Sequence, residues 1–206
     1  MNKKVKIAIE IGLLGVIVLL SFLVYNSVNT NIEFENEKAR KQELVVEKLI
    51  KIRDLQNVYE SKHDTYSNSW ESLIEFALKD SLVFDYKEGD MEDSAAVAEG
   101  RAFIKKVKRP AIEKLIADGI IADEKELKEL RYVPETDQEF TIKSGSVMAG
   151  GIKMPTFEVG VTWDVLLKGL DKQLIINAKE NSRVRSGFEG VRVGKIDEAS
   201  TEGNWE

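Results

Sequence analysis

The sequence contains no cysteine and only one histidine among 206 residues, and these scarcities exclude several classes of function. Without cysteine the chain has no disulfide, thiolate metal site, iron–sulfur cluster, cysteine nucleophile or lipid-modified N-terminal cysteine. The single histidine, His63, argues against a zinc enzyme and against a histidine-based catalytic triad. The net charge of −6 argues against general nucleic-acid binding, which requires basic surfaces. We therefore expect no nucleic-acid partner.

Catalytic motifs are also absent. The sequence has no phosphate-binding loop, dinucleotide-binding glycine motif or metalloprotease helix motif, and Ser144-Gly145-Ser146-Val147 fails the nucleophile-elbow pattern. The acidic run 85–93 fails the EF-hand pattern because Lys87 and Gly89 fall at ligand positions. We expect a solvated loop there, with loose calcium binding as the alternative. The sequence thus predicts a non-enzymatic protein without catalytic, cofactor or metal residues, and a carboxylate pair among its 36 acidic residues is the remaining route to an enzyme.

The strongest positive signal is an apolar run near the N-terminus. From Ile7 to Tyr25 the only charged residue is Glu10. These residues would extend about 28 Å as a helix, close to the thickness of a hydrocarbon core. The sequence therefore predicts a transmembrane helix over 7–25, preceded by a short stub over 1–6.

Charge on the two sides of this run predicts its orientation. Lys3, Lys4 and Lys6 precede the run, and the first 26 residues have a net charge of +2. The remaining 180 residues have a net charge of −8. By the positive-inside rule, the N-terminus is cytoplasmic and the rest of the chain is exported.

Two alternatives to a retained anchor remain open. A cleaved signal peptide usually has an apolar core of about 7–15 residues followed by small residues, whereas this core is long and Asn26-Ser27-Val28-Asn29 is a poor cleavage site. A buried helix of a soluble protein is the second alternative. Glu10 also has two interpretations: a shallow residue that reaches toward Lys6, or a group that pairs with a partner inside the membrane.

The segment 26–62 is predicted to continue the helix in amphipathic form. No glycine occurs between positions 15 and 89 and no proline before position 110, so nothing forces a break. Apolar residues recur every three or four positions at Leu44, Val45, Leu49, Ile52, Leu55, Val58 and Tyr59. We predict that Leu44, Leu49, Ile52, Leu55 and Tyr59 pack beneath a C-terminal sheet. A two-chain coiled coil would show a similar stripe.

The region 63–131 is predicted to be helical, in several pieces. Ser69 is an N-cap ahead of an apolar stretch, and Asp123 with Glu126 resembles a capping box. From 94 to 130 we expect two or three helices, with Ser94 as an N-cap, Pro110 opening a helix and Gly119 closing one. The basic residues Lys105, Lys106, Lys108 and Arg109 would then form a solvated helix end.

From Tyr132 onward the apolar period changes to that of strands. Alternation predicts strands around Phe140 and Ile142 and around Phe157, Val159 and Val161, and further short strands at 174–176 and 191–193. Residues 163–170 read as a helical turn closed by Gly169, and Trp205 is expected to hold the tail. The region 132–206 is therefore predicted to be an antiparallel sheet with its tail, which gives the chain an α+β fold.

The N-terminal third resembles type IV pilins and type II secretion pseudopilins. The likeness rests on the basic stub, the apolar helix with Glu10 near its start, and the run Ile52-Arg53-Asp54-Leu55-Gln56-Asn57-Val58-Tyr59 followed by Tyr66 and Leu73. That run is similar to an IR-x-x-Q-x-x-Y pattern of these families. In this chain Val5 stands where their cleavage site has glycine.

The resemblance implies a structural role. It implies a single-pass subunit of a bacterial envelope assembly for secretion or a pilus-like fibre, with its helix in the inner membrane and its C-terminal domain in the periplasm. It also implies that Glu10 takes part in assembly by neutralising an N-terminal amine of a neighbouring subunit, with protein partners bound through the transmembrane helix. The alternative is a membrane-tethered accessory or binding protein of a fixed envelope complex.

Overall fold

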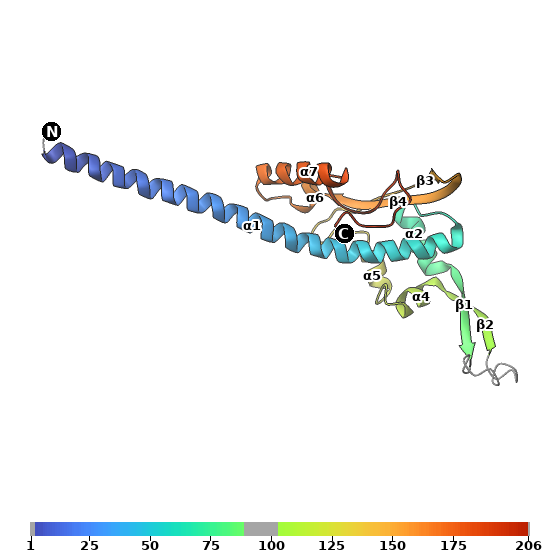
Figure 1. Cartoon of the computed structure of the whole chain (residues 1–206). Coiled ribbons are helices and arrows are strands. Elements are labelled where there is room, and N and C mark those ends of the chain that lie inside the picture. Colours follow the sequence, from blue (N-terminus) through green and yellow to red (C-terminus); the bar gives the residue numbers. More distant parts are fainter. Residues whose placement is uncertain (1–2, 89–102, 206) are drawn as a thin grey trace.

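A long helix carries an α+β head in the computed structural model, which describes residues 3–88 and 103–205 (Figure 1). The helices are α1 (Lys3–His63), α2 (Trp70–Lys79), α4 (Ala111–Ala117), α5 (Glu124–Glu129), α6 (Trp163–Leu166) and α7 (Lys172–Ser186). The strands are β1 (Ser81–Glu88), β2 (Phe103–Pro110), β3 (Thr141–Ala149), β4 (Ile152–Thr162) and β5 (Gly190–Gly194). The predicted α+β class, with a long N-terminal apolar helix and a C-terminal antiparallel sheet, is confirmed.

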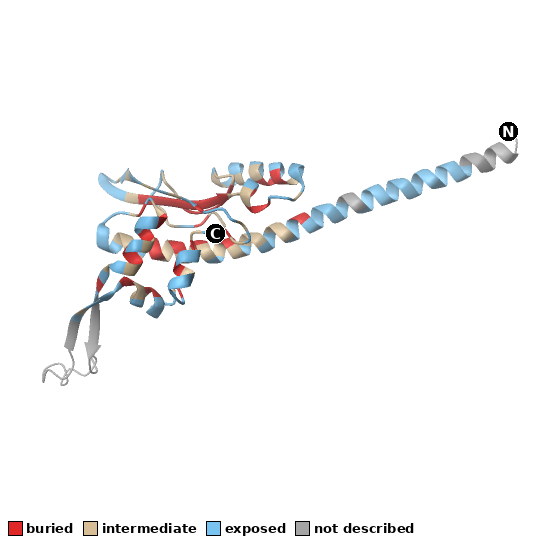
Figure 2. Cartoon of the chain, turned by 180° about the vertical axis from the view of Figure 1, so that it is seen from behind, coloured by how far each residue is buried: buried red, intermediate tan, exposed pale blue. Residues whose placement is uncertain are grey.

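The helix α1 is unbroken over 61 residues, which corresponds to about 90 Å. The polar stretch 26–31 does not interrupt it, because it contains neither glycine nor proline. The N-terminal part of α1 projects away from the head, whereas its C-terminal part lies inside it (Figures 1 and 2). One helix therefore forms two parts of the molecule: the exposed stem, up to residue 33, and a central element of the head.

The apolar stripe of α1 forms the centre of the head. Val45, Leu49, Ile52 and Leu55 have no exposed surface, and this part of α1 contacts β4 and β5. The predicted packing of the stripe beneath the sheet is confirmed for Leu49, Ile52 and Leu55, while Leu44 and Tyr59 are half-buried at its margins. Burial of such side chains is the main stabilising contribution to the head.

The sheet has the order β3-β4-β5, and both of its pairings are antiparallel. Phe157, Val159 and Val161 alternate on the buried face of β4, as predicted. The β3–β4 turn is made by Gly150 and Gly151, whose positive φ values of 58° and 82° suit a two-residue hairpin turn.

Several predicted helix ends are confirmed. The Ser69 side chain accepts a hydrogen bond from the Ser72 N–H at the start of α2, and Asp123 accepts one from the Glu126 N–H at the start of α5. Glu126 in turn accepts a bond from the Ala122 N–H, so each carboxylate satisfies a backbone donor that the helix leaves free. Helix α4 starts directly after Pro110, as the sequence predicts.

The prediction of helix from 94 to 130 is partly wrong. Phe103–Pro110 is strand β2, paired antiparallel with β1, and within the described residues 103–130 of this stretch the helices are α4 and α5. The sequence does contain a signal for strand β1, which is the alternation of Leu82, Phe84 and Tyr86. The acidic residues that follow obscured this strand period. Lys105–Arg109 therefore belongs to a strand, not a helix end, and the predicted N-cap Ser94 lies outside the described residues.

The predicted strand over 174–176 is also wrong, because these residues belong to α7. The consecutive Leu-Ile-Ile suggested a strand, yet Ile175 and Ala178 are the buried pair and Ile176 faces solvent. The Asp171 side chain caps the helix start, and Gly187 ends it in a left-handed conformation with φ of 72°. These two caps outweigh the strand preference of the isoleucines.

Candidate functional site

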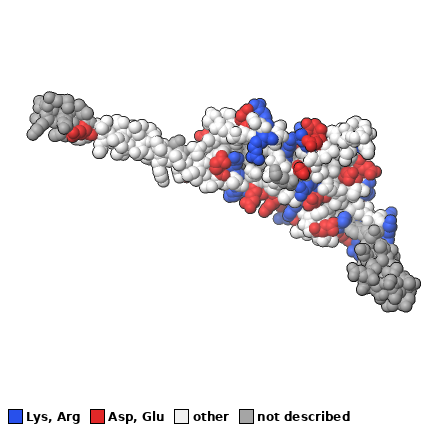
Figure 3. All heavy atoms as spheres, in the orientation of Figure 1, with Lys and Arg blue, Asp and Glu red and all other residues white. Residues whose placement is uncertain are grey.

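The stem of α1 presents an apolar surface on all of its sides. Between Ile11 and Tyr25 the large apolar side chains are 52–72% exposed, and the stem is almost free of charged atoms while the head is covered with them (Figure 3). A helix that is apolar all round is stable only when lipid or protein surrounds it. Among the described residues, one helix is long and apolar enough to cross a membrane, with a mean hydropathy of 2.2 over its most apolar window.

Glu10 marks the N-terminal end of this apolar surface. Its side chain is exposed on α1, immediately before the apolar run that ends at Tyr25. The predicted pairing of Glu10 with Lys6 involves a lysine whose side chain lies outside those described. The structure thus places an exposed carboxylate near the end of a membrane-length apolar segment.

A shallow groove follows one side of the stem. It is lined by Ile17, Leu20, Ser21, Val24, Tyr25 and Val28. The small hydroxymethyl group of Ser21 lies between larger apolar side chains, and small residues let helices in a membrane approach one another closely. The groove is therefore a shallow apolar strip along one side of the exposed stem.

The stem enters the head at Phe34, which is the first buried residue of α1 among the side chains that the structure describes. Nearby, the Arg40 guanidinium donates to both carboxylate oxygens of Glu135 and to Glu37, at 2.7–2.9 Å. These hydrogen bonds lower the pKa of both Glu37 and Glu135. Arg40 therefore ties α1 to the loop before β3 at the point where the stem meets the head.

Two lysines on the next turns of α1 hold α5 against it. Lys48 donates to the backbone carbonyls of Glu129 and Tyr132, each at 2.9 Å, and partial burial lowers the pKa of its ammonium group. Lys51 pairs with Glu126, whose pKa is lowered by that contact. Long charged side chains of α1 therefore contact the head on the side away from the sheet.

The residues that carry the pilin-like resemblance have packing roles. The Gln56 amide is fully buried and forms two hydrogen bonds of 2.9 Å with the backbone of Ser67, which fixes the turn after α1. Tyr66 contacts Phe157 of the sheet with ring centroids 4.5 Å apart. Tyr59 stacks on His63 at 4.4 Å. These contacts therefore connect the end of α1 and the turn after it to the sheet.

A buried ion pair on the outer face of the sheet was not predicted. Glu158 of β4 and Arg192 of β5 are 7% and 9% exposed, and their side chains meet at 2.5 Å. Arg192 also donates to the Ser186 carbonyl at 2.7 Å, and its guanidinium lies 5.3 Å from the Phe188 ring centre. Alternation did place both charged residues opposite the core face, but sequence spacing could not show that they meet.

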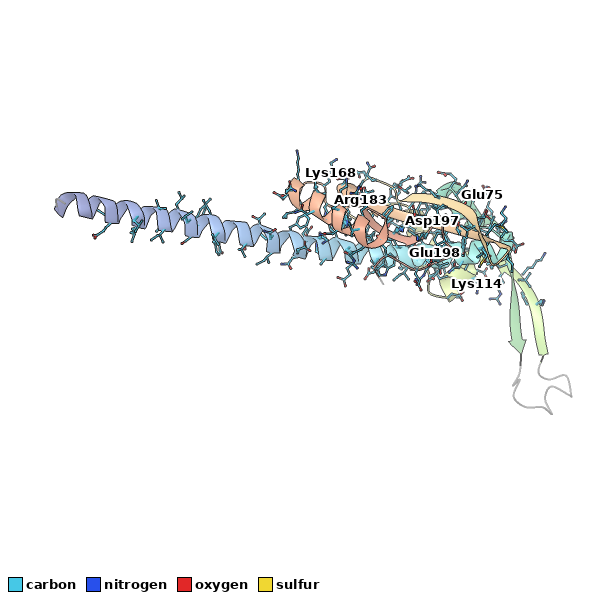
Figure 4. The ribbon with its side chains drawn as sticks, turned by 45° about the horizontal axis from the view of Figure 1, so that its top comes forward. Glu75, Lys114, Lys168, Arg183, Asp197 and Glu198 are labelled. Atoms are coloured by element: carbon cyan, nitrogen blue, oxygen red, sulfur yellow. The ribbon has the colours of Figure 1, made fainter. Side chains whose placement is uncertain are left out.

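The C-terminal tail is hydrogen-bonded to the strand that carries Arg192. The Asn204 side chain accepts from the Arg192 N–H and donates to Ser186 and to the Gly190 carbonyl. Trp205 packs against the core, as predicted. The tail segment before it carries Asp197 and Glu198 (Figure 4), of which Glu198 accepts from Lys195 at 2.8 Å. The network fixes β5, the end of α7 and the tail to one another.

Reactive groups do not gather in the part of the chain that is described. Residues 3–88 and 103–205 contain no group of three or more potential metal ligands. His63 lies at the end of α1, where its Nε2 atom is 3.5 Å from the Asp80 carboxylate that also binds Lys62. Part of the acidic run that was compared with a calcium loop belongs to β1, and the rest lies outside the described residues.

No protein-family model, curated protein or solved structure matches the chain. The stem, Glu10 and the architecture of the head are therefore the features of the chain that bear on its function.

Proposed function

We propose that the chain is a non-enzymatic, single-pass membrane protein that serves as a pilin- or pseudopilin-like structural subunit of a bacterial envelope assembly. Its stem lies in the inner membrane with the N-terminus in the cytoplasm, and its head lies in the periplasm. Neighbouring subunits or other proteins of the complex contact it through the transmembrane part of α1.

The continuity of α1 is the observation that carries this proposal. The exposed apolar stem and the fully buried stripe at Leu49, Ile52 and Leu55 belong to the same unbroken helix. A cleavable leader needs no such connection to the core, whereas a subunit that transmits position from membrane to head does. Arg40 and Lys48 support this role because Arg40 joins α1 to the loop before β3 and Lys48 joins α1 to α5.

A membrane-tethered accessory protein of a fixed complex is the second candidate. The observation that favours it is Val5, which occupies the position of the cleavage-site glycine in the families that the chain resembles. Without cleavage, the N-terminal amine that Glu10 would neutralise does not form at Lys6. In that case Glu10 would pair with a different cation of the complex.

The anchor is tested by mass and topology together. We expect the membrane-extracted protein to retain residues 1–25, and we expect a reporter fused after Asn204 to be active only outside the cytoplasm. The reason is that a long apolar run without a small-residue cleavage site remains in the membrane as an anchor, and the lysines before it remain in the cytoplasm. A mature N-terminus near residue 28, or a cytoplasmic reporter signal, would contradict the proposal.

Replacing Glu10 by Gln separates an assembling subunit from a simple anchor. We expect Glu10→Gln to insert and fold normally but to lower the yield of cross-linked oligomers, because a cation that pairs with Glu10 would lose its counter-charge in the membrane. Glu33→Gln is the matched control, since Glu33 lies on α1 beyond the apolar run and accepts from Asn29. Equal oligomer yields for both variants at matched expression would favour the tethered accessory protein.

A further inference from the structure

A cleft lies in the head where α1, α7 and the C-terminal tail come together. Its volume is about 570 Å³, which is within the range of sites that hold a small molecule. Helix α1 contributes Lys38 and Gln42 to the lining, and α7 contributes Asn181 and Arg185. The tail contributes Trp205. Three elements that are far apart in the sequence therefore share one space.

The charged side chains that line this cleft are both cationic. The Lys38 ammonium group is held in place, because it lies 3.0 Å from the Glu35 carboxylate and 5.7 Å from the centre of the Trp163 ring. Arg185 forms no ion pair or side-chain hydrogen bond within residues 3–88 and 103–205. Within the same residues no aspartate or glutamate lines the cleft. The Arg185 guanidinium therefore keeps its donors for an external carboxylate or phosphate group.

Two amide side chains of the lining also lack an internal partner. Gln42 is half-buried and Asn181 is exposed, and neither side chain forms a hydrogen bond with any part of the chain that the structure describes. An amide both donates and accepts hydrogen bonds, as does the hydroxyl group of a sugar. These two amides therefore suit a ligand that carries several hydroxyl groups beside its charge.

The two tryptophans of the lining are fixed by the fold. Trp163 is 3% exposed, and its indole N–H donates to the Ser182 hydroxyl at 2.6 Å. Trp205 is half-buried and packs against the core, and it lies so close to Gly203 that a Cβ on that glycine would clash with the indole ring. The Trp205 ring therefore offers a rigid apolar surface, which a ring-shaped ligand covers at a small cost in side-chain entropy.

We propose that this cleft binds an acidic sugar, by which we mean a saccharide that carries a carboxylate or a phosphate group. Arg185 and Lys38 bind the anionic group. Gln42 and Asn181 bind the hydroxyl groups, and Trp205 contacts one face of the sugar ring. A bare inorganic anion would leave both amides and most of the 570 Å³ unused, and a cationic ligand would be repelled by the two cations.

Titrations of the full chain in detergent, followed by calorimetry, test this proposal. The probes are two acidic sugars, galacturonic acid and glucose 6-phosphate, with their neutral sugars, galactose and glucose, and their bare anions, acetate and inorganic phosphate. We expect at least one acidic sugar to bind at least tenfold more tightly than both its neutral sugar and its bare anion. The acidic sugar that binds more tightly identifies the anionic group as a carboxylate or a phosphate.

Arg185→Gln should weaken the binding of that acidic sugar tenfold or more, because it removes the charge-assisted hydrogen bonds. The matched control is Arg183→Gln, since Arg183 lies two residues earlier on α7 (Figure 4), pairs with Glu180 and does not line the cleft. This variant should bind like the unmodified protein. Both arginines are exposed, so neither change should alter the melting temperature of the head.

Lys38→Gln repeats the test from the other helix. It removes the second cation of the cleft and should weaken the binding of the acidic sugar roughly threefold or more, while binding of the neutral sugar stays unchanged. Three results would overturn the proposal: no acidic sugar that binds more tightly than its two matched probes, equal losses for Arg185→Gln and Arg183→Gln, or undiminished binding in both Arg185→Gln and Lys38→Gln.

This ligand-binding role goes beyond the proposed structural function and does not depend on the orientation of the chain in the membrane. The titrations measure binding to the extracted protein, whereas topology and oligomer yield are measured in cells and membranes. A cleft that binds no acidic sugar is thus distinguishable from a failure of the proposed function.

Discussion

Replacing Leu55 by Ala in the full chain in detergent is expected to lower the melting temperature of the head by roughly 6–12 °C. Leu55 has no exposed surface and lies in the stripe of α1 beneath the sheet. Removing a fully buried leucine side chain costs about 3 kcal/mol, since apolar contacts are lost and a cavity remains. In a domain of this size each kcal/mol corresponds to roughly 2–4 °C.

The matched control for this change is Ile176→Ala in α7. Ile176 is 56% exposed, so its truncation removes few contacts and should leave the melt nearly unchanged. If Leu55→Ala melted like Ile176→Ala, the stripe would not be the core of the head in solution. The coiled-coil interpretation of the stripe would then be preferred, and the same substitution should weaken association between chains.

The sequence was informative where local signals agree with the final packing. The stripe through Leu49, Ile52 and Leu55 has helical spacing, and no glycine or proline competes with it, so α1 could be predicted over most of its length. Ser69 and Asp123 were recognisable as caps because their side chains act on backbone donors only a few residues away. Such interactions do not depend on the rest of the fold.

The errors arose where a local signal was ambiguous. The consecutive apolar residues 174–176 suit a strand or a helix, and only the caps at Asp171 and Gly187 decide between the two. The short alternation at Leu82, Phe84 and Tyr86 became a strand because β2 is available to pair with it some twenty residues later. A hairpin with so long a connection has no local turn signature.

Some features of the candidate site could likewise be predicted from the sequence, and others could not. The apolar stem and Glu10 could be found from composition alone, because a membrane-length run is a property of consecutive residues. The pair Glu158–Arg192 could not be found, because it depends on which strands become neighbours in the sheet. The run through Gln56 and Tyr66 was recognised as a resemblance, but its role in packing became clear only from its contacts with Ser67 and Phe157.

The buried ion pair should be a polar position that is sensitive to substitution. We expect Glu158→Gln to destabilise the head by about 3–5 kcal/mol, because it leaves the Arg192 guanidinium buried without its counter-charge. Thermal melts of the full chain in detergent measure this directly. The matched control is Glu75→Gln on α2 (Figure 4), where Glu75 accepts from Lys79 at an exposed site, and this variant should melt like the unmodified protein.

A double substitution distinguishes the cost of an unpaired charge from a specific need for the pair. Replacing both Glu158 and Arg192 by Met removes both charges together, and apolar residues of similar size often stabilise a protein as well as a buried pair does. The double variant should therefore recover most of the stability that Glu158→Gln loses. If it is as unstable as the single variant, the hydrogen bond from Arg192 to the Ser186 carbonyl stabilises the head more than the ion pair does. If Glu158→Gln itself melts like Glu75→Gln, water reaches the Arg192 guanidinium in solution and the guanidinium does not need Glu158 as its counter-charge.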